Sequence, residues 1–215
     1  MKKVNAVVLF SMLLVSIGIG QQVHAQTMSK KFKSVKAEID INASADRVWE
    51  AMVLDYGEIS SFSPYIYASD YEAGSLKGEL GARRKCAFNE KGTRVSHEEI
   101  KDLDSKNRVM RNVVIGGEKL PLNFDNSQAY YRVRDNGDGT STASYEFQYR
   151  TKPGMMTGLV KGTFQKQLAG TLIGLKHYVE TGEKVNPETG LYKEIKDDYK
   201  VRQGDDVTLL TKGNF

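Results

Sequence analysis

Apolar and polar residues alternate along several short stretches of the chain, a pattern typical of strands with one buried face. The first stretch is 35–41, where valine, alanine and isoleucine alternate with charged residues. Similar runs predict strands at 83–88, 94–103 and 108–115, each bounded by residues that favour turns. Short strands joined by short turns indicate an antiparallel sheet.

The clearest hairpin joins residues 129–134 to 143–150. Its turn, DNGDG at 135–139, is rich in residues that tolerate a positive φ. Alternation assigns one set of side chains to the inner face: Ala129, Tyr131, Val133, Ala143, Tyr145, Phe147 and Tyr149.

Two segments follow a helical period instead. Ser44 can cap a helix that ends near 55–57. A longer helix is predicted from Met155 to about Glu180, with an apolar stripe at Val160, Phe164, Leu168, Leu172, Leu175 and Val179. Four glycines, at 158, 162, 170 and 174, lie mostly off the centre of this stripe. Either they soften the helix, or another segment closely approaches its back, or small residues are simply tolerated there.

The two ends of the chain differ from the middle. Residues 1–25 combine a basic start, an apolar run too short to span a membrane, and small residues at Val23 and Ala25. We expect a cleaved signal peptide, a mature chain starting at Gln26 in the periplasm or secreted, and no stable membrane insertion after cleavage. Residues 26–184 then form the domain. Residues 185–215 are expected to be a loosely attached polar tail, with a short helix near 191–199, dispensable for folding and a candidate docking segment for a protein partner.

Composition excludes several classes of function. The chain has 31 basic and 27 acidic residues, and removal of Lys2 and Lys3 leaves an excess of two. The basic residues are scattered, which argues against a nucleic-acid partner. Cys86 is the single cysteine, so no internal disulfide can form. No spacing typical of a metal site or a phosphate-binding loop occurs, so no cofactor is expected.

The order of strand, helix, turn, several strands and long helix resembles the START-like (SRPBCC, Bet v 1-like) superfamily. It resembles in particular the polyketide cyclase/dehydrase and lipid-transport group of that superfamily. The resemblance covers roughly residues 34–182 and lies in ASADRVWEAMVLDYGEISSFSP, GELGARRKCAF, VSHEEIKDLDSKNRV, LPLNFDNSQAYYRV, GDGTSTASYEFQY and GLVKGTFQKQLAGTLIGLKHYVE. It implies an α+β helix-grip fold, a curved antiparallel sheet around the long C-terminal helix. It also implies that the turn at 56–65 plugs the mouth of an internal cavity; alternatively, its large side chains are ordinary core.

The inner strand faces and the stripe of the last helix would line this cavity. The candidate ligand-binding residues are Arg84, Cys86, Phe88, Glu98, Arg111, Tyr131, Tyr145, Phe147, Tyr149, Phe164 and Leu168. Arg84 and Glu98 should pair across neighbouring strands, since an unpaired buried charge is costly. The pair could contact a ligand or merely brace the sheet, or Arg84 could reach solvent at the rim.

An apolar and aromatic interior with few polar groups suits a hydrophobic or amphipathic small molecule such as a lipid, isoprenoid or polyketide. We therefore expect an exported carrier of such a molecule. The alternative is an enzyme of the cyclase/dehydratase type, in which Glu98 or a tyrosine would act as acid or base. Neither histidine of the mature chain belongs to a recognisable catalytic arrangement.

Overall fold

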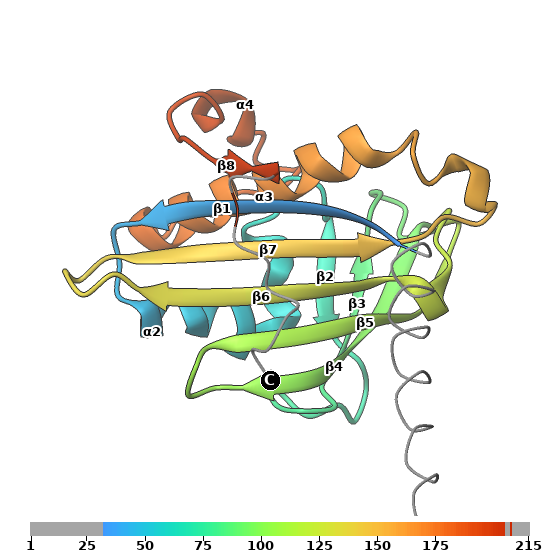
Figure 1. Ribbon diagram of the computed structural model, residues 1–215, viewed down its shortest axis with the longest axis horizontal. Helices are drawn as coiled ribbons and strands as arrows, with labels where there is room; N and C mark the ends of the chain where they lie inside the picture. The colour runs from blue at the N-terminus through green and yellow to red at the C-terminus, as the bar shows by residue number, and fades with distance from the viewer. Residues whose placement is uncertain (1–31, 205–206, 208–215) are drawn as a thin grey trace, which may run out of the picture. The chain divides into compact units, whose positions relative to one another are not determined.

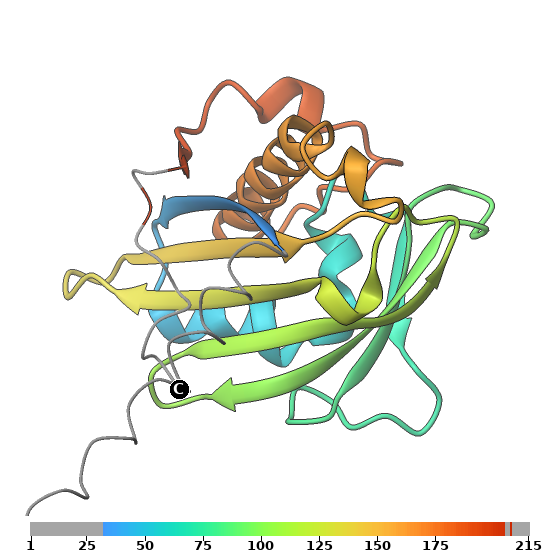
Figure 2. The same cartoon turned by 45° about the vertical axis from the view of Figure 1, so that its right-hand side comes forward.

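The computed structural model describes residues 32–204 and residue 207. The predicted signal peptide therefore lies outside the described residues. The strands form a single antiparallel sheet in the order β2-β3-β4-β5-β6-β7-β1-β8. Their bounds are β1 Lys33–Ile41, β2 Ala68–Tyr71, β3 Arg83–Ala87, β4 Val95–Asp104, β5 Val109–Glu118, β6 Gln128–Asp135, β7 Ser141–Tyr149 and β8 Arg202–Gln203. The sheet curves, so that β2 and β3 run at a steep angle to β1, β6 and β7 (Figures 1 and 2).

The long helix, α3, spans Lys161–Thr181 and lies across the inner face of the sheet, against β1 and β7. The shorter helical elements are α2 Ala45–Trp49, η1 Glu50–Leu54, η2 Tyr56–Ser61, η3 Phe124–Asn126, η4 Gly154–Met156 and α4 Tyr192–Ile195. This arrangement confirms the α+β helix-grip fold. The Ser44 hydroxyl accepts a hydrogen bond from the Arg47 amide, as expected of a helix cap.

The helix predicted from Met155 begins later, at Lys161. The preceding residues form a tight turn in which the Thr157 hydroxyl donates to the Gly154 carbonyl and accepts from the Thr151 amide. Such local side-chain bonds compete with helix formation, and Gly158 and Gly162 add the cost of backbone freedom. The helical spacing of apolar residues therefore begins before the first residue of the helix itself.

The core lies between α3 and the inner face of the sheet. The residues assigned inward by alternation on β1, β6 and β7 are buried or packed against it. On α3, Leu168, Leu172 and Leu175 are buried in the core, whereas Phe164 and Val179, together with Val160 just before the helix, pack at the border of the core. The predicted apolar stripe thus faces the sheet.

Two of the four helix glycines are approached closely by another segment. A Cβ on Gly170 would lie 2.5 Å from the Tyr65 hydroxyl, and one on Gly174 would collide with the Phe62 carbonyl. No atom lies within 4 Å of the corresponding positions on Gly158 and Gly162. Close approach therefore explains the second pair of glycines, and the turn after η2 is the segment that packs there.

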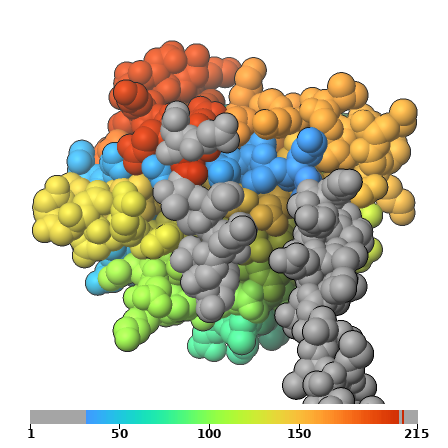
Figure 3. All heavy atoms as spheres, viewed as in Figure 1, coloured from blue at the N-terminus to red at the C-terminus, as the bar shows by residue number. Residues whose placement is uncertain are grey.

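The expectation of a loosely attached tail is wrong for the described part of residues 185–207. Val185 is fully buried against Gly174, and Ile195 is buried in the same core. The β8 strand pairs with β1, the Tyr199 hydroxyl bonds His177, and Arg202 pairs with Glu38 and Asp40. In Figure 3 the red spheres of this segment lie against the blue of β1. This segment contains few apolar residues, and they follow neither a helical nor a strand period. The sequence pattern therefore did not predict these contacts.

Candidate functional site

A cavity lies between the inner face of the sheet, the first half of α3 and the turn after η2. The cavity has a volume of about 160 Å³. The wall is mainly apolar and aromatic and includes Phe88, Val114, Leu120, Leu122, Phe147 and Phe164. Polar side chains enter at a few points only, among them Arg84, Arg94, Ser96, Glu98, Gln167 and Thr171.

Arg84 and Glu98 face each other across β3 and β4, as predicted. The Arg84 Nε and Nη2 atoms donate to Glu98 Oε2 at 3.1 and 2.7 Å. Arg84 is only 2% exposed, so the ion pair is removed from water. Burial is the largest single influence on Arg84 and opposes its charge, but Glu98 together with Tyr56, Cys86 and Tyr131 outweighs burial, so the pKa of the guanidinium is raised. Both residues therefore form a charged, mutually neutralising pair in the cavity wall.

The remaining polar atoms of this pair are bonded to other protein groups. Arg84 also donates to the Tyr56 carbonyl and the Tyr131 hydroxyl. Glu98 also accepts from Asn112 Nδ2 and Ser96 Oγ, both at 2.8 Å. Four N–H or O–H donors thus engage the Glu98 carboxylate. Arg84 has little capacity left to neutralise the charge of a ligand, although it lies at the cavity.

Tyrosines surround the same pair. The Arg84 guanidinium lies 4.0 Å from the centre of the Tyr56 ring, and the rings of Tyr131 and Tyr145 stack with centroids 4.4 Å apart. Burial raises the pKa of all three phenols. At neutral pH they are therefore protonated, and their hydroxyls can act as hydrogen-bond donors.

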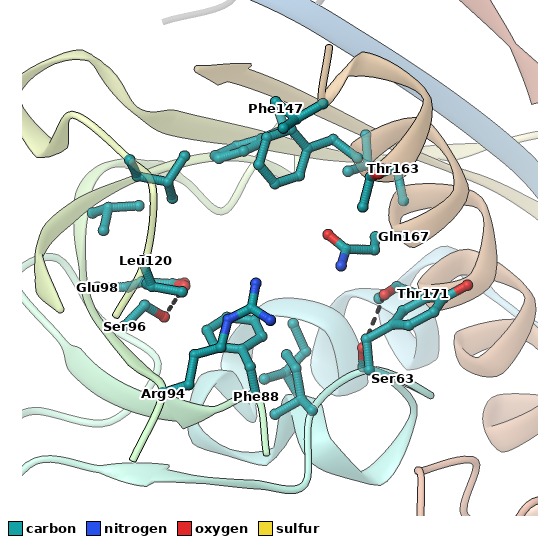
Figure 4. A pocket seen from close by; sticks show the side chains of 18 of the residues that line it. Ser63, Phe88, Arg94, Ser96, Glu98, Leu120, Phe147, Thr163, Gln167 and Thr171 are labelled. Carbon is teal, nitrogen blue, oxygen red and sulfur yellow. Dashed lines mark hydrogen bonds between the residues drawn. The ribbon is translucent and has the colours of Figure 1, made fainter. Parts of the chain in front are cut away.

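Arg94 and Gln167 differ from most other polar groups of the wall. The ends of both side chains point into the cavity (Figure 4). Within residues 32–204, neither side chain has a hydrogen-bond or ion-pair partner, and Arg94 is exposed at the cavity's edge. By contrast, Ser96 is bonded to Glu98, and Ser63 and Thr171 are bonded to each other at 3.0 Å. Arg94 and Gln167 thus have unused bonding capacity for a ligand, as does the exposed Thr163, whose side chain also has no partner within residues 32–204.

The opposite wall is aromatic. Phe164 packs edge-on against Phe147 and Tyr149, with ring centroids 5.2 and 4.5 Å apart. Leu168 continues this surface along α3. Phe147, Phe164 and Leu168 offer only apolar faces to the cavity. The hydroxyl of Tyr149, which lies behind them, donates to the Thr157 carbonyl.

The structure places seven of the eleven predicted site residues in the cavity wall: Arg84, Phe88, Glu98, Tyr145, Phe147, Phe164 and Leu168. Cys86, Tyr131 and Tyr149 share the inner side of the sheet but lie in the core behind this wall. Burial raises the pKa of the Cys86 thiol to about 12, so it is no nucleophile at neutral pH.

Arg111 was assigned wrongly. It lies on the outer face, where it pairs with Asp102 and donates to Gln128. The assignment followed Val109 and Val113, but β5 carries apolar residues on both faces. The inner residue is Asn112, which lies opposite the inward Ala129 of β6. Pairing with β6 would have given the correct face.

The turn after the first helix both closes the cavity and contributes side chains to the core. Ile59, Ser63 and Tyr65 line the cavity, together with Ile66. Tyr56 and Phe62 belong to the core, with exposures of 0% and 3%. The turn therefore closes one side of the cavity while anchoring itself in the interior.

Sequence reasoning missed Arg94, Gln167 and the loop 120–122. Arg94 lies one residue before β4 but begins the predicted strand at 94–103, and it shares the parity of Glu98, so alternation could have placed it on the inner face. Gln167 precedes the stripe residue Leu168 and could have been placed beside it on the helix. Across residues 32–204, no group of three or more His, Cys, Asp or Glu side chains could hold a metal ion. No helix among the described residues has the length and apolar character needed to cross a membrane.

Comparison with known proteins agrees with the observed fold. The family described as polyketide cyclase / dehydrase and lipid transport matches residues 33–180. No curated protein matches the chain. Among solved structures, XoxI from Bacillus cereus is 17% identical, covering 69% of this chain and 96% of its own, with a TM-score of 0.56.

Two further structures are similar. Ara h 8.0201 is 18% identical, covers 70% of this chain and 99% of its own, and has a TM-score of 0.56. Norcoclaurine synthase from Thalictrum flavum is 16% identical, covers 80% and 99%, and has a TM-score of 0.53. At such identities the likeness shows the fold alone.

Proposed function

Because the chain belongs to the polyketide cyclase / dehydrase and lipid-transport family, we propose that it binds a small amphipathic molecule in its cavity and carries it. The observation that carries this proposal is the bonding state of the cavity wall. Most of the wall is apolar or aromatic, and the buried charges of Arg84 and Glu98 satisfy each other. Such a wall favours a ligand that is apolar over most of its surface.

The ligand's polar end is proposed to bind Arg94 and Gln167. A guanidinium can donate two parallel hydrogen bonds to a carboxylate or other oxyanion, and an amide can donate or accept one more. The apolar body would then contact Phe88, Phe147 and Phe164. A lipid, isoprenoid or polyketide with one acidic or carbonyl end meets both requirements.

Export is part of the proposal and is supported by the sequence of residues 1–25 alone. Protein recovered from the periplasm or medium should begin at Gln26. Recovery of the full-length chain from the cytosol would contradict this part without affecting the binding proposal.

The alternative, a cyclase or dehydratase, is weaker on the same geometry. Glu98 is the carboxylate of the cavity wall, and four donors already engage it. Three of these donors engage Oε2 and one engages Oε1, so a substrate proton could be accepted only at Oε1. Tyr145 also lies in the cavity wall, but the burial that raises the pKa of its phenol makes it a weak proton donor.

Native mass spectrometry of protein purified from its own host tests the proposal most directly. A co-purifying amphipathic molecule supports carriage, whereas an empty protein that turns over an aromatic polyketide supports catalysis. In solution, a fluorescent fatty acid or a naphthalene-type dye should bind. Failure of every apolar probe to bind, together with the absence of a co-purified ligand, would contradict the proposal.

Paired variants locate the binding. Arg94→Ala should weaken fatty-acid binding about tenfold, because a charge-assisted hydrogen bond is lost. Arg132→Ala, on the outer face of β6, should leave it unchanged. Likewise, Tyr145→Ala should weaken dye binding and Tyr130→Ala, on the outer face, should not. The reverse order within either pair would place the ligand outside the cavity.

A further inference from the structure

The connection between β7 and α3 exposes large apolar side chains. We call residues 152–160 the tip loop. Met155 is 87% exposed and Leu159 81%, whereas the next most exposed large hydrophobic side chain of the described chain, Leu80, is 58% exposed. Isolated apolar side chains on a surface are ordinary, but two nearly fully exposed ones within five residues indicate a contact surface.

The tip loop is held in shape by hydrogen bonds. The Thr157 hydroxyl bonds both the Gly154 carbonyl and the Thr151 amide, and the Tyr149 hydroxyl donates to the Thr157 carbonyl. Tyr149 and Thr151 are themselves buried. Met155 and Leu159 therefore project from a loop whose conformation is fixed by hydrogen bonds.

This loop adjoins the wall of the cavity. Its base is joined to the β5–β6 connection, because Thr151 pairs with Leu122 and the Lys152 amide donates to the Pro121 carbonyl at 3.1 Å. Leu122 and Pro121 line the cavity, as does Val160 at the other end of the loop. The orange segment that leads into α3 projects at one end of the molecule in Figures 1 and 3.

Unpaired basic residues flank the tip loop in the sequence and occur on the neighbouring β5–β6 connection. Within residues 32–204, the charged groups of Lys119, Arg150, Lys152 and Lys161 form no ion pair or hydrogen bond. Residues 118–126 and 150–166 together hold five basic residues, including Lys166, against two acidic ones, Glu118 and Asp125. This end of the molecule is therefore positive and apolar at once.

We propose that the tip loop docks the protein on the surface of an anionic lipid bilayer. Met155 and Leu159 enter the boundary between headgroups and acyl chains, and the basic side chains meet the lipid phosphates. Docking is peripheral and needs no spanning helix. It brings the part of the cavity wall formed by Leu122 and Val160 to the lipid surface. The proposal stands on the tip loop alone and is independent of what the cavity binds.

Vesicle co-sedimentation of the chain from Gln26 onward, which retains every described residue, tests this. The protein should bind vesicles of phosphatidylcholine mixed with phosphatidylglycerol and bind vesicles of phosphatidylcholine alone less. Met155→Ser/Leu159→Ser should lower the partition coefficient about tenfold or more, since both apolar side chains are lost. Lys152→Glu/Lys161→Glu should lower it about tenfold on the mixed vesicles, with a smaller effect at high salt.

Leu76→Ser/Leu80→Ser is the matched control, because it removes two exposed leucines from the β2–β3 connection instead. It should bind vesicles like the wild type. Equal vesicle binding by the wild type and Met155→Ser/Leu159→Ser would overturn the proposal. So would a concentration-dependent dimer, with no vesicle binding, that this variant abolishes. Dye binding without vesicles should be unchanged in all three variants, which separates failure of docking from failure of the cavity.

Discussion

The Phe62 carbonyl occupies the place where a side chain on Gly174 would have to stand. The turn after η2 and the buried half of α3 therefore pack backbone to backbone, and Val185 closes the contact from the other side at 3.3 Å from the same position. A main-chain carbonyl cannot rotate away as a flexible side chain can. The contact consequently fixes how far the cavity-lining turn can move from the helix.

Gly174→Ala should destabilise the protein by about 2–3 kcal/mol, because the added methyl group forces the turn away from the helix. Gly162→Ala is the control, since its Cβ would enter open space, and it should stabilise by up to about 1 kcal/mol through higher helix propensity. Denaturant unfolding measures both. Equal stability of the two variants would mean that the turn does not pack against Gly174.

Arg84→Ala should cost about 3–5 kcal/mol, because it leaves the Glu98 carboxylate in the interior without its ion partner. Arg83→Ala removes the neighbouring arginine, which is half exposed and pairs with Glu99, and should cost less than about 1 kcal/mol. Arg84→Leu/Glu98→Leu should recover much of the loss, since no charge then remains unpaired. A double variant as unstable as Arg84→Ala would argue against this explanation.

Truncation after Lys184 should lower the melting temperature, because it removes Val185 and Ile195 from the core and β8 from the sheet edge. Within the full chain, Ile195→Ala should cost about 2–4 kcal/mol. Lys193→Ala, exposed on the same short helix, should have no measurable effect. A truncated chain that melts like the full-length chain would restore the view of this segment as a dispensable tail.

Acid should weaken the attachment of β8. Hydrogen bonds from Arg202 lower the pKa of Asp40 from 3.8 to about 2. A carboxyl group whose pKa is lowered by folding contributes stability above its unfolded pKa and loses it as the pH falls toward the folded one. The stability difference between the wild type and Asp40→Asn should therefore shrink between about pH 4 and pH 2. Because Asp40 is largely exposed, we expect less than about 1 kcal/mol. A difference that is constant over this range would contradict the assignment.

Where one face of a strand is clearly apolar, alternation predicted the structure correctly. The inward faces of β1, β6 and β7, and the Arg84–Glu98 pair, follow from it directly. Arg111 shows its limit: β5 has valines on its outer face as well as Met110 and Val114 on its inner one, so apolar content could not choose between them. Only pairing with a neighbouring strand decides such a case.

The tail and the ligand-facing groups were harder to predict for a different reason. Val185 and Ile195 are buried in the core as isolated apolar side chains. An isolated apolar residue produces no periodic pattern in the sequence. Arg94 becomes informative only when its partners are known, because an arginine in a sequence gives no sign of being unpaired. Whether a polar side chain has a hydrogen-bond partner is known only from the folded structure. Here it separates the wall residues that are bonded to other protein groups from those that are free to bind a ligand.

The uneven burial of α3 has a consequence for motion. From Leu168 to Leu175 every residue is buried, whereas none of the residues from Lys161 to Gln167 is. Local opening costs least where little surface is buried, so amide hydrogens of the first two turns should exchange with solvent well before those of the later turns. The part that opens easily carries Thr163, Phe164 and Gln167 of the cavity wall. Transient unwinding there would widen the entrance while the rest of the fold stays closed.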